Sequence, residues 1–207
     1  MVYIKNPALI EKVSMEIIDE EIKRSSFKEE ELPIVKRMIH TTGDFDYKNI
    51  IDFKGEAVKV GVELLKSGNK IFTDTRMVWS GINKKALKKS NSELLCYIDD
   101  EKTSKMAKDM ETTRSSVCVD IAVLEKAEIF VVGNAPTALF RLGELITEGR
   151  AKPKLIIGVP VGFVGAAEAK EYIRNFDVPS ITTIGTKGGS NVAASVVNAL
   201  LYMTVGR

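Results

Sequence analysis

Apolar residues recur at helical spacing at the start of the chain. Leu9, Val13 and Ile17 follow one another at intervals of four, the period of one helix face. Asn6 and Pro7 stand just before this pattern, and they are typical of a helix N-cap and of the first helical position. The pattern therefore predicts a helix that begins at Pro7.

A second helix is predicted from about residue 33 to residue 41. Ile34 and Met38 form its apolar side, and a Thr-Thr-Gly-Asp sequence ends it. A spacing of three places Arg37 and His40 on one face of this helix, one turn apart. His40 is the only histidine of the chain, so a reaction that needs an imidazole has one candidate.

After the mainly helical N-terminal part, residues 1–60, short apolar runs alternate with helical segments. The predicted strands are KIFTD, ELLCYI, AEIFVVG, PKLIIGV and SITTIG. The predicted helices are EAVKVGVELLKSG, KTSKMAKDM, NAPTALFRLGELITEG, VGAAEAKEYIRNF and GSNVAASVVNALLYM. This alternation predicts a single α/β domain over residues 1–207, with a mostly parallel, doubly wound (Rossmann-like) sheet and helices on both faces.

Composition and charge narrow the functional classes. Thirty Lys and Arg residues stand against 28 Asp and Glu residues, giving a net charge of +2, so we expect no nucleic-acid partner. The one lysine-rich run, NKKALKKS, is typical of a solvated helix face. No window approaches the roughly 20 apolar residues of a membrane span, and the N-terminus has no signal-peptide pattern, so we expect a cytoplasmic protein. Cys96 and Cys118 lack the spacing of a zinc site or a disulfide framework.

Three glycine-containing segments lie where a predicted strand leads into a predicted helix, the usual place of ligands in doubly wound sheets. They are VVGNAPTALFRL, IIGVPVGFVGAAEAKE and TTIGTKGGSNVAASVVNAL. Their glycines follow neither the G-x-G-x-x-G pattern nor a Walker A loop, which excludes the best-known nucleotide motifs. Spacing alone leaves two alternatives open: cradles for an anion such as a carboxylate, or plain strand-to-helix turns.

These same segments, behind RMIHTTGD, resemble the precorrin-8X methylmutase family (precorrin isomerase) and its cobalt-precorrin-8 counterpart. SMEIIDEE, EAVKVGVELLKSGNKIFTDTRMVWSGI and TTRSSVCVD extend the resemblance over nearly the whole chain. It implies an intramolecular transferase of corrin biosynthesis that moves a methyl group from C-11 to C-12 of a tetrapyrrole. It also implies a homodimer and no cofactor of the protein itself, with any cobalt carried by the substrate.

The resemblance assigns the role of proton donor and acceptor to His40. An imidazole changes charge near neutral pH, which suits protonation of a conjugated macrocycle. Without the resemblance, His40 would read as a structural or helix-capping histidine. Arg37 by itself would disfavour an imidazolium at His40, and a bound substrate carboxylate would reverse that effect.

Further residues are predicted to bind a substrate that carries many carboxylate arms. They are Ser14, Arg37, Thr42, Arg114, Lys187, Gly188, Gly189 and Ser190. For Arg114 and Lys187, interpreted as cations within loops, the alternative is ordinary surface charge. For the Gly188–Ser190 segment, interpreted as bare N–H groups opening a helix, the alternative is a plain N-terminal turn.

Two departures from the family pattern and two rival functions stay open. TDTRMV places Thr73 and Arg76 where relatives often have cysteine and an acidic residue, and IGTKGGS lacks one cation of the common RGRKGGS. The rivals are a noncatalytic tetrapyrrole carrier and an α/β transferase that binds a nucleotide or another anion.

One apolar stripe has two interpretations. Leu139, Leu142 and Ile146 recur at helical spacing and form either a dimer contact or part of the core.

Overall fold

The computed structural model describes residues 4–206 and contains one six-stranded sheet, ordered β1-β6-β5-β4-β2-β3. Every neighbouring pair is parallel except β1 and β6, which pair antiparallel. The strands are β1 (Ile51–Lys54), β2 (Lys70–Thr73), β3 (Glu93–Leu95), β4 (Ile129–Val132), β5 (Leu155–Gly158) and β6 (Ser180–Thr183). The α/β class and the mostly parallel sheet are therefore confirmed.

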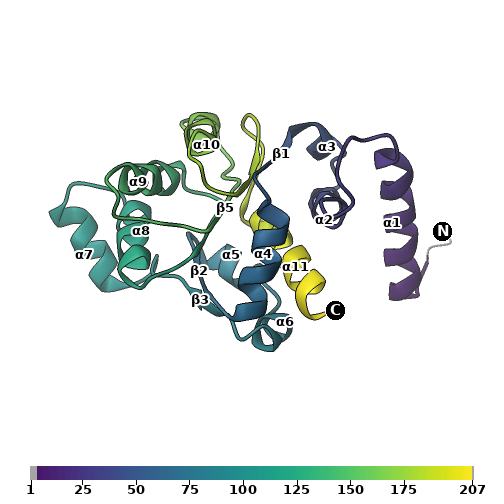
Figure 1. Cartoon of the computed structure of the whole chain (residues 1–207), viewed down its shortest axis with the longest axis horizontal. Coiled ribbons are helices and arrows are strands. Elements are labelled where there is room, and N and C mark those ends of the chain that lie inside the picture. Colours follow the sequence, from purple (N-terminus) through teal and green to yellow (C-terminus); the bar gives the residue numbers. More distant parts are fainter. Residues whose placement is uncertain (1–3, 207) are drawn as a thin grey trace.

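Helices cover both faces of this sheet (Figure 1). Near the N-terminus they are α1 (Pro7–Ile22), α2 (Leu32–Thr42), α3 (Tyr47–Ile50) and α4 (Ala57–Ser67). Around the middle they are α5 (Arg76–Gly81), α6 (Lys84–Lys89), α7 (Glu101–Asp109) and α8 (Arg114–Leu124). The last three are α9 (Pro136–Thr147), α10 (Ala166–Arg174) and α11 (Ser190–Val205).

The central strands are buried from both sides, as their continuous apolar sequences require. Along β5, Leu155 and Ile157 face one core, which α2, α4, α5 and α11 close, while Ile156 faces a second core under α8, α9 and α10. Leu139 and Leu142 of α9 are fully buried in the second core. Of the two interpretations of the α9 stripe, the structure therefore supports core for these residues.

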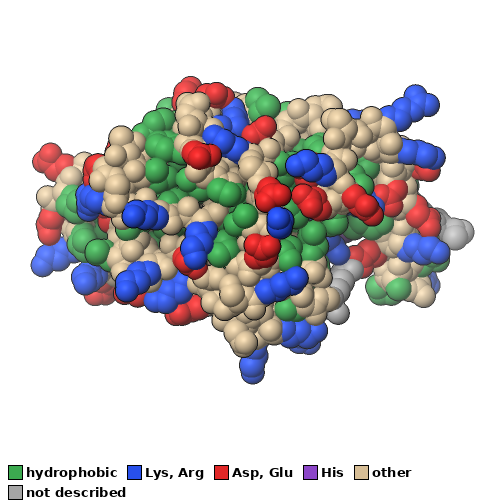
Figure 2. Space-filling view, in the orientation of Figure 1, with side chains coloured by type: hydrophobic (Ala, Val, Ile, Leu, Met, Phe, Trp, Pro, Cys, Tyr) green, Lys and Arg blue, Asp and Glu red, His purple; other side chains and the backbone are tan. Residues whose placement is uncertain are grey.

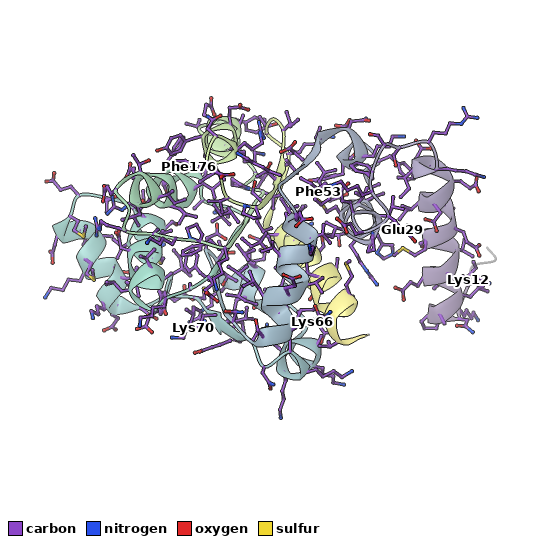
Figure 3. The ribbon with its side chains drawn as sticks, in the orientation of Figure 1. Lys12, Glu29, Phe53, Lys66, Lys70 and Phe176 are labelled. Atoms are coloured by element: carbon purple, nitrogen blue, oxygen red, sulfur yellow. The ribbon has the colours of Figure 1, made fainter. Side chains whose placement is uncertain are left out.

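Helices α1, α2 and α3 form a layer at one end of the molecule, where α2 packs against α11 (Figure 1). The Asn6 side chain caps α1 by accepting hydrogen bonds from the N–H groups of Ala8 and Leu9, at 3.0 and 3.3 Å. Phe53 of β1 lies between this layer and the rest of the sheet (Figure 3), where its ring meets that of Phe27 edge-on at 6.1 Å. The predicted helix start at Pro7 is confirmed.

One strand was not foreseen, and one sequence-based expectation was wrong. Residues 51–54 form an edge strand within the mainly helical N-terminal part; only four residues long, they have no apolar run. Arg114 is the first residue of α8 and not part of a loop, because the Thr113 hydroxyl caps that helix by accepting from the N–H of Ser116.

Charges of both signs are interspersed over the surface, as Figure 2 shows for one face. The lysine-rich run forms the short helix α6, and its lysines are exposed, as predicted. Within the described part of the chain, no helix combines the length and the apolar character needed to cross a membrane.

Candidate functional site

The carboxyl ends of the parallel strands meet at one edge of the sheet, where a buried aspartate joins two of the loops. Asp74 follows β2 and is fully buried. Its carboxylate accepts hydrogen bonds from the N–H groups of Gly133, Asn134 and Ala135, at 3.0, 2.8 and 2.9 Å. Burial raises the pKa of the Asp74 carboxyl, and these three donors oppose the rise. The loop after β4 therefore turns its N–H groups inward.

The loop after β6, residues 184–189, is called the β6 loop below, and it needs glycine for a close approach to its neighbour. A Cβ atom on Gly188 would lie 2.1 Å from the carbonyl oxygen of Val159. Gly189 has a φ of 139° and donates its N–H to the same oxygen at 2.8 Å. Any side chain at position 188 would force the two loops apart, so both predicted glycines have a structural reason.

Lys187 ties the β6 loop to the end of α2. Its ammonium lies 2.7 Å from the Asp44 carboxylate and 3.0 Å from that of Asp46. Hydrogen bonds to these two carboxylates raise the pKa of Lys187 to about 12 and lower the pKa of both aspartates. The Tyr47 hydroxyl adds a long hydrogen bond to the carbonyl of Gly188, at 3.4 Å. The loop and the helix end thus form one unit, with an exposed cation at their junction.

His40 lies in the last turn of α2, and its side chain is exposed. Within the described residues, no hydrogen bond or ion pair holds its ring, so the imidazole is free to meet a ligand. One turn earlier, Arg37 forms an ion pair with Glu11 of α1 at 3.3 Å and lies over the Tyr202 ring, 5.3 Å from its centroid. Ser14 is one turn from Glu11 along α1. The structure therefore gathers Ser14, Arg37 and His40 on two contacting helices.

The Thr42 side chain forms hydrogen bonds at the C-terminal end of α2. Its hydroxyl donates to the carbonyl of Met38 at 2.8 Å and accepts a hydrogen bond from the N–H of Asp44 at 3.3 Å. Gly43 then ends the helix in the left-handed conformation, with a φ of 65°. Thr42 thereby shapes the turn that delivers Asp44 to Lys187, a role that its predicted contact with substrate did not include.

A cavity of about 260 Å³ lies beside Arg37, between α1, α2 and the C-terminal half of α11. Met15, Arg37 and Tyr202 are among its lining residues. Its walls are mainly apolar, and Lys36 and Arg37 give them two cations. This combination suits an apolar group that carries an anionic arm.

Arg114 lies on the other side of the same edge. Its guanidinium donates a long hydrogen bond to the Ile98 carbonyl, at 3.4 Å, just after β3. Four inter-strand spacings separate β3 from β6, which places these two strands roughly 19 Å apart across the sheet. Arg114 bonds to the segment just after β3, whereas Lys187 follows β6, so the two cations belong to different parts of this edge.

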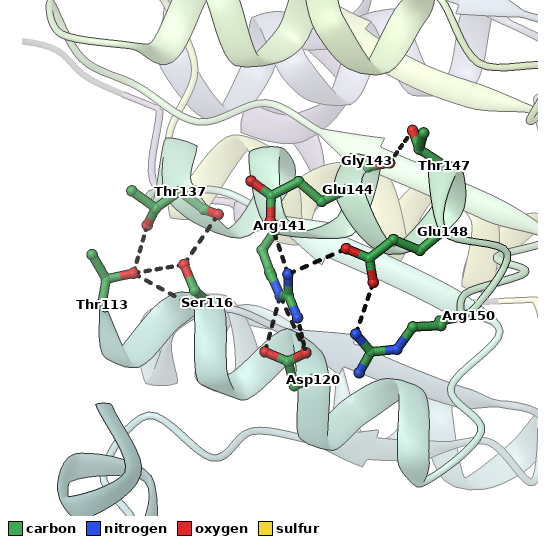
Figure 4. Close-up of polar contacts among 10 residues, drawn as sticks. All are labelled: Thr113, Ser116, Asp120, Thr137, Arg141, Gly143, Glu144, Thr147, Glu148 and Arg150. Carbon is green, nitrogen blue, oxygen red and sulfur yellow. Dashed lines mark hydrogen bonds and ion pairs between the residues drawn. The ribbon is translucent and has the colours of Figure 1, made fainter. Parts of the chain in front are cut away.

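Hydroxyl groups connect the helix starts near Arg114, as Figure 4 shows. The Thr113 and Thr137 hydroxyls are 3.0 Å apart, and the Ser116 hydroxyl lies 2.9 Å from that of Thr113. Deeper between α8 and α9, the Arg141 guanidinium grips the Asp120 carboxylate at 2.7 Å. These contacts hold α8 against α9. The hydroxyl, guanidinium and carboxylate groups that form them are thereby already paired within the protein.

Large apolar side chains stand exposed on the loops of this edge. Phe163 and Val164, just before α10, are 94% and 90% exposed. Val161 and Ile184 of neighbouring loops are about half exposed. Apolar surface at the mouth of a site suits a large flat ligand or a protein partner.

Sequence reasoning missed three residues that organise this edge. Asp74 and Lys170 are charged yet fully buried, and Asp44 pairs with a lysine 143 positions away. Asp74 had a signal, since it stands at the end of a predicted strand, KIFTD. Lys170 had none, because AAEAKEYIR reads as an ordinary surface helix.

Comparisons with known proteins agree on one family. A family model described as precorrin-8X methylmutase matches residues 9–203. The cobalt-precorrin-8 methylmutase of Salmonella typhimurium is 44% identical, with 98% of each chain covered, and that of Priestia megaterium is 43% identical, with 94% of this chain and 87% of the relative covered. A crystal structure of precorrin-8x methyl mutase from Thermus thermophilus superimposes with a TM-score of 0.89 at 37% identity, covering 96% of each chain.

Proposed function

Because this chain belongs to the precorrin-8X methylmutase family, an isomerase family of cobalamin biosynthesis, we propose that it moves a methyl group from C-11 to C-12 of cobalt-precorrin-8. The product is then a cobyrinate. Relatives from Priestia megaterium, Salmonella typhimurium and Leptospira interrogans, at 42 to 44% identity, are named cobalt-precorrin-8 methylmutases, which supports the cobalt-containing substrate. The substrate carries its own metal, and we propose that the reaction needs no cofactor of the protein.

The proposed step changes no atom count. The bond from the methyl carbon to C-11 breaks and a bond to C-12 forms with the same electron pair, so substrate and product are isomers. His40 supplies a proton to the conjugated ring system and takes one back, which favours the electron distribution of the product. The observation that carries this role is the exposed, unbonded imidazole one turn from Arg37, at the helix end joined to the β6 loop.

The carboxylate arms of the substrate need donors on several sides of the ring. Arg37 offers donors from α2, and the β6 loop offers Lys187 with the N–H groups that open α11. The Ser14 hydroxyl on α1 donates to the Ile10 carbonyl at 2.8 Å and would turn from it to meet an arm. The ammonium of Lys187 can donate a hydrogen bond to a carboxylate arm, as its third partner, because Asp44 and Asp46 hold it at the surface and leave it exposed. The exposed apolar loops before α10 supply a wall for the ring itself.

We propose that the active species is a homodimer. A corrin-like macrocycle is large for the open edge of one sheet, and two-fold pairing is the commonest closed symmetry. The exposure of Phe163 and Val164, and the place of Arg114 beside β3 at the far end of the sheet from β6, support a site that a second copy completes. Light scattering at assay concentration should give about twice the chain mass; an active monomer would contradict this.

Location in the cytoplasm remains a prediction from sequence.

One assay tests the activity against its rivals. The purified protein is incubated with cobalt-precorrin-8 and, separately, with metal-free precorrin-8, and the visible spectrum is followed. We expect conversion of the spectrum with the cobalt form at least. A tetrapyrrole carrier would keep the colour without spectral conversion, and a nucleotide-binding transferase would bind neither form; either result would contradict the proposal.

A further inference from the structure

A lysine is buried beneath the β6 loop. Lys170 of α10 has no exposed surface, and within the described residues no carboxylate lies within ion-pair distance of its ammonium. The ammonium donates instead to the Thr183 hydroxyl at 3.0 Å and to the carbonyl oxygen of Lys187 at 2.8 Å. Burial, with a smaller contribution from the like charge of Arg174, lowers the pKa of Lys170 to about 8. A buried ammonium without a counter-ion calls for a reason beyond packing.

The carbonyl that Lys170 holds belongs to the peptide unit between Lys187 and Gly188. The same oxygen accepts a second hydrogen bond, from the Thr183 hydroxyl at 2.7 Å. A trans peptide unit is planar, and its N–H points opposite to its carbonyl. Because the carbonyl is fixed toward the interior, the Gly188 N–H is directed away from it. Within the described part of the chain, no acceptor engages that N–H.

The arrangement also makes the Gly188 N–H a stronger donor. Two hydrogen bonds to one carbonyl oxygen, one of them from a cation, polarise the peptide unit. The neighbouring peptide is held as well, because Gly189 donates to the Val159 carbonyl. The loop therefore cannot rotate this N–H inward without breaking these bonds.

We propose that Lys170 is a positioning residue for substrate binding: by holding the Lys187 carbonyl, it directs the Gly188 N–H, and with it the Lys187 ammonium, toward a carboxylate arm of the tetrapyrrole. This inference rests on the proposed function. Lys170 itself does not touch substrate and acts only through the β6 loop. The reacting carbons and His40 are not involved, so substrate affinity depends on Lys170 and the chemical step does not.

The test compares three variants of the full-length protein. Lys170→Met removes the ammonium and keeps a similar length and volume, and Thr183→Val removes the other donor to the same carbonyl. Lys54→Met is the matched control, because the Lys54 ammonium also donates to backbone carbonyls, those of Arg174 and Phe176, but away from the β6 loop. Steady-state conversion of cobalt-precorrin-8 gives KM and kcat, and thermal unfolding reports the fold.

We expect Lys170→Met to raise KM about tenfold, the lower end of the effect of one charge-assisted hydrogen bond, with kcat within about threefold. Thr183→Val should raise KM in the same way but less, and it tests the inference alone if Lys170→Met does not fold. Lys54→Met should keep the KM of the wild type even where it lowers thermal stability.

Three outcomes would overturn the inference while the proposed function stands: a folded Lys170→Met with unchanged KM, a fall in kcat alone, or an equal rise of KM in Lys54→Met. A wild-type protein that does not convert the substrate would overturn the proposed function and this inference together. The two failures are thus distinguished by the wild-type assay.

Discussion

Two buried charges hold two neighbouring loops of the same sheet edge, and they do so in opposite ways. Asp74 is an anion that accepts three backbone N–H groups of the loop after β4. Lys170 is a cation that donates to a backbone carbonyl of the β6 loop. An anion beneath a loop turns N–H groups inward, whereas a cation beneath a loop turns a carbonyl inward and leaves an N–H for the outside.

The comparison bears on the two interpretations that spacing left open, for two of the three glycine segments. The loop after β4 has its N–H groups occupied, so it is a structural turn and not an anion cradle. The β6 loop has an exposed lysine and an outward N–H beside the start of a 16-residue helix, and is therefore suited to a carboxylate. Glycine content alone does not separate the two loops; the sign of the buried charge does.

The largest expected effect concerns the helix end that the β6 loop meets. His40→Ala should lower kcat by about 10² to 10⁴, the usual contribution of proton transfer by a side chain, and leave tetrapyrrole binding nearly unchanged. Turnover and binding are measured by visible absorption. Thr41→Ala, on the exposed next position, is the control and should retain activity. Full activity in His40→Ala would show that the proton transfer does not take place at this end of α2.

The second prediction tests the structural role of the loop after β4. Asp74→Ala leaves three N–H groups, two of them buried, without an acceptor, so it should lower the free energy of unfolding by about 3 to 5 kcal/mol. Urea unfolding measures the change. Asp100→Asn, an exposed aspartate, should change stability by less than about 0.5 kcal/mol. If a folded Asp74→Ala instead lost affinity for substrate without losing stability, the contrast between the loops would be wrong.

The sheet could be predicted from the sequence because its central strands are continuous apolar runs. EIFVVG and LIIGV form β4 and β5, and the sequence identified each of the parallel strands. The edge strand IDFK could not be found, because its four residues mix polar and apolar positions and pair only with a strand about 130 positions later. Local periodicity reports burial and contains no signal for such distant pairing.

The site could be predicted in part, for a similar reason. The helical spacing of Arg37 and His40 and the glycines of the β6 loop are local features. The ion pair between Lys187 and Asp44 and the burial of Lys170 depend on how the chain folds back on itself. The resemblance named residues that are predicted to meet substrate, but not the buried charges beneath the loops.

The third prediction uses the depressed pKa of Lys170. In the folded protein this pKa is about 8, below its ordinary 10.5, so between these values the unfolded chain binds more protons and stability rises with pH. The rise reaches about 3 kcal/mol at most, since one pKa unit corresponds to about 1.4 kcal/mol. Wild type should therefore gain stability over Lys170→Met between pH 8 and 10 in urea unfolding. A constant difference would mean that Lys170 is already neutral or is well solvated.

The smallest effects separate the two ends of the edge. Arg37 is held by Glu11, one turn from His40, while Arg114 is exposed and bonds just after β3, four strand spacings from β6. Each should contribute about 1 kcal/mol to binding through a partly solvated carboxylate, seen as about a fivefold weaker Kd in Arg37→Ala or Arg114→Ala. Because the two arginines lie on different helices and have different partners, the double variant should show the sum of the single effects, within about 0.5 kcal/mol. Coupling beyond that value would mean that one arm of the substrate meets both arginines, as a two-fold partner could arrange. Unchanged dissociation constants in both single variants would show instead that the arms are held by the β6 loop, and the effect of Lys170→Met should then account for most of the affinity that the carboxylates provide.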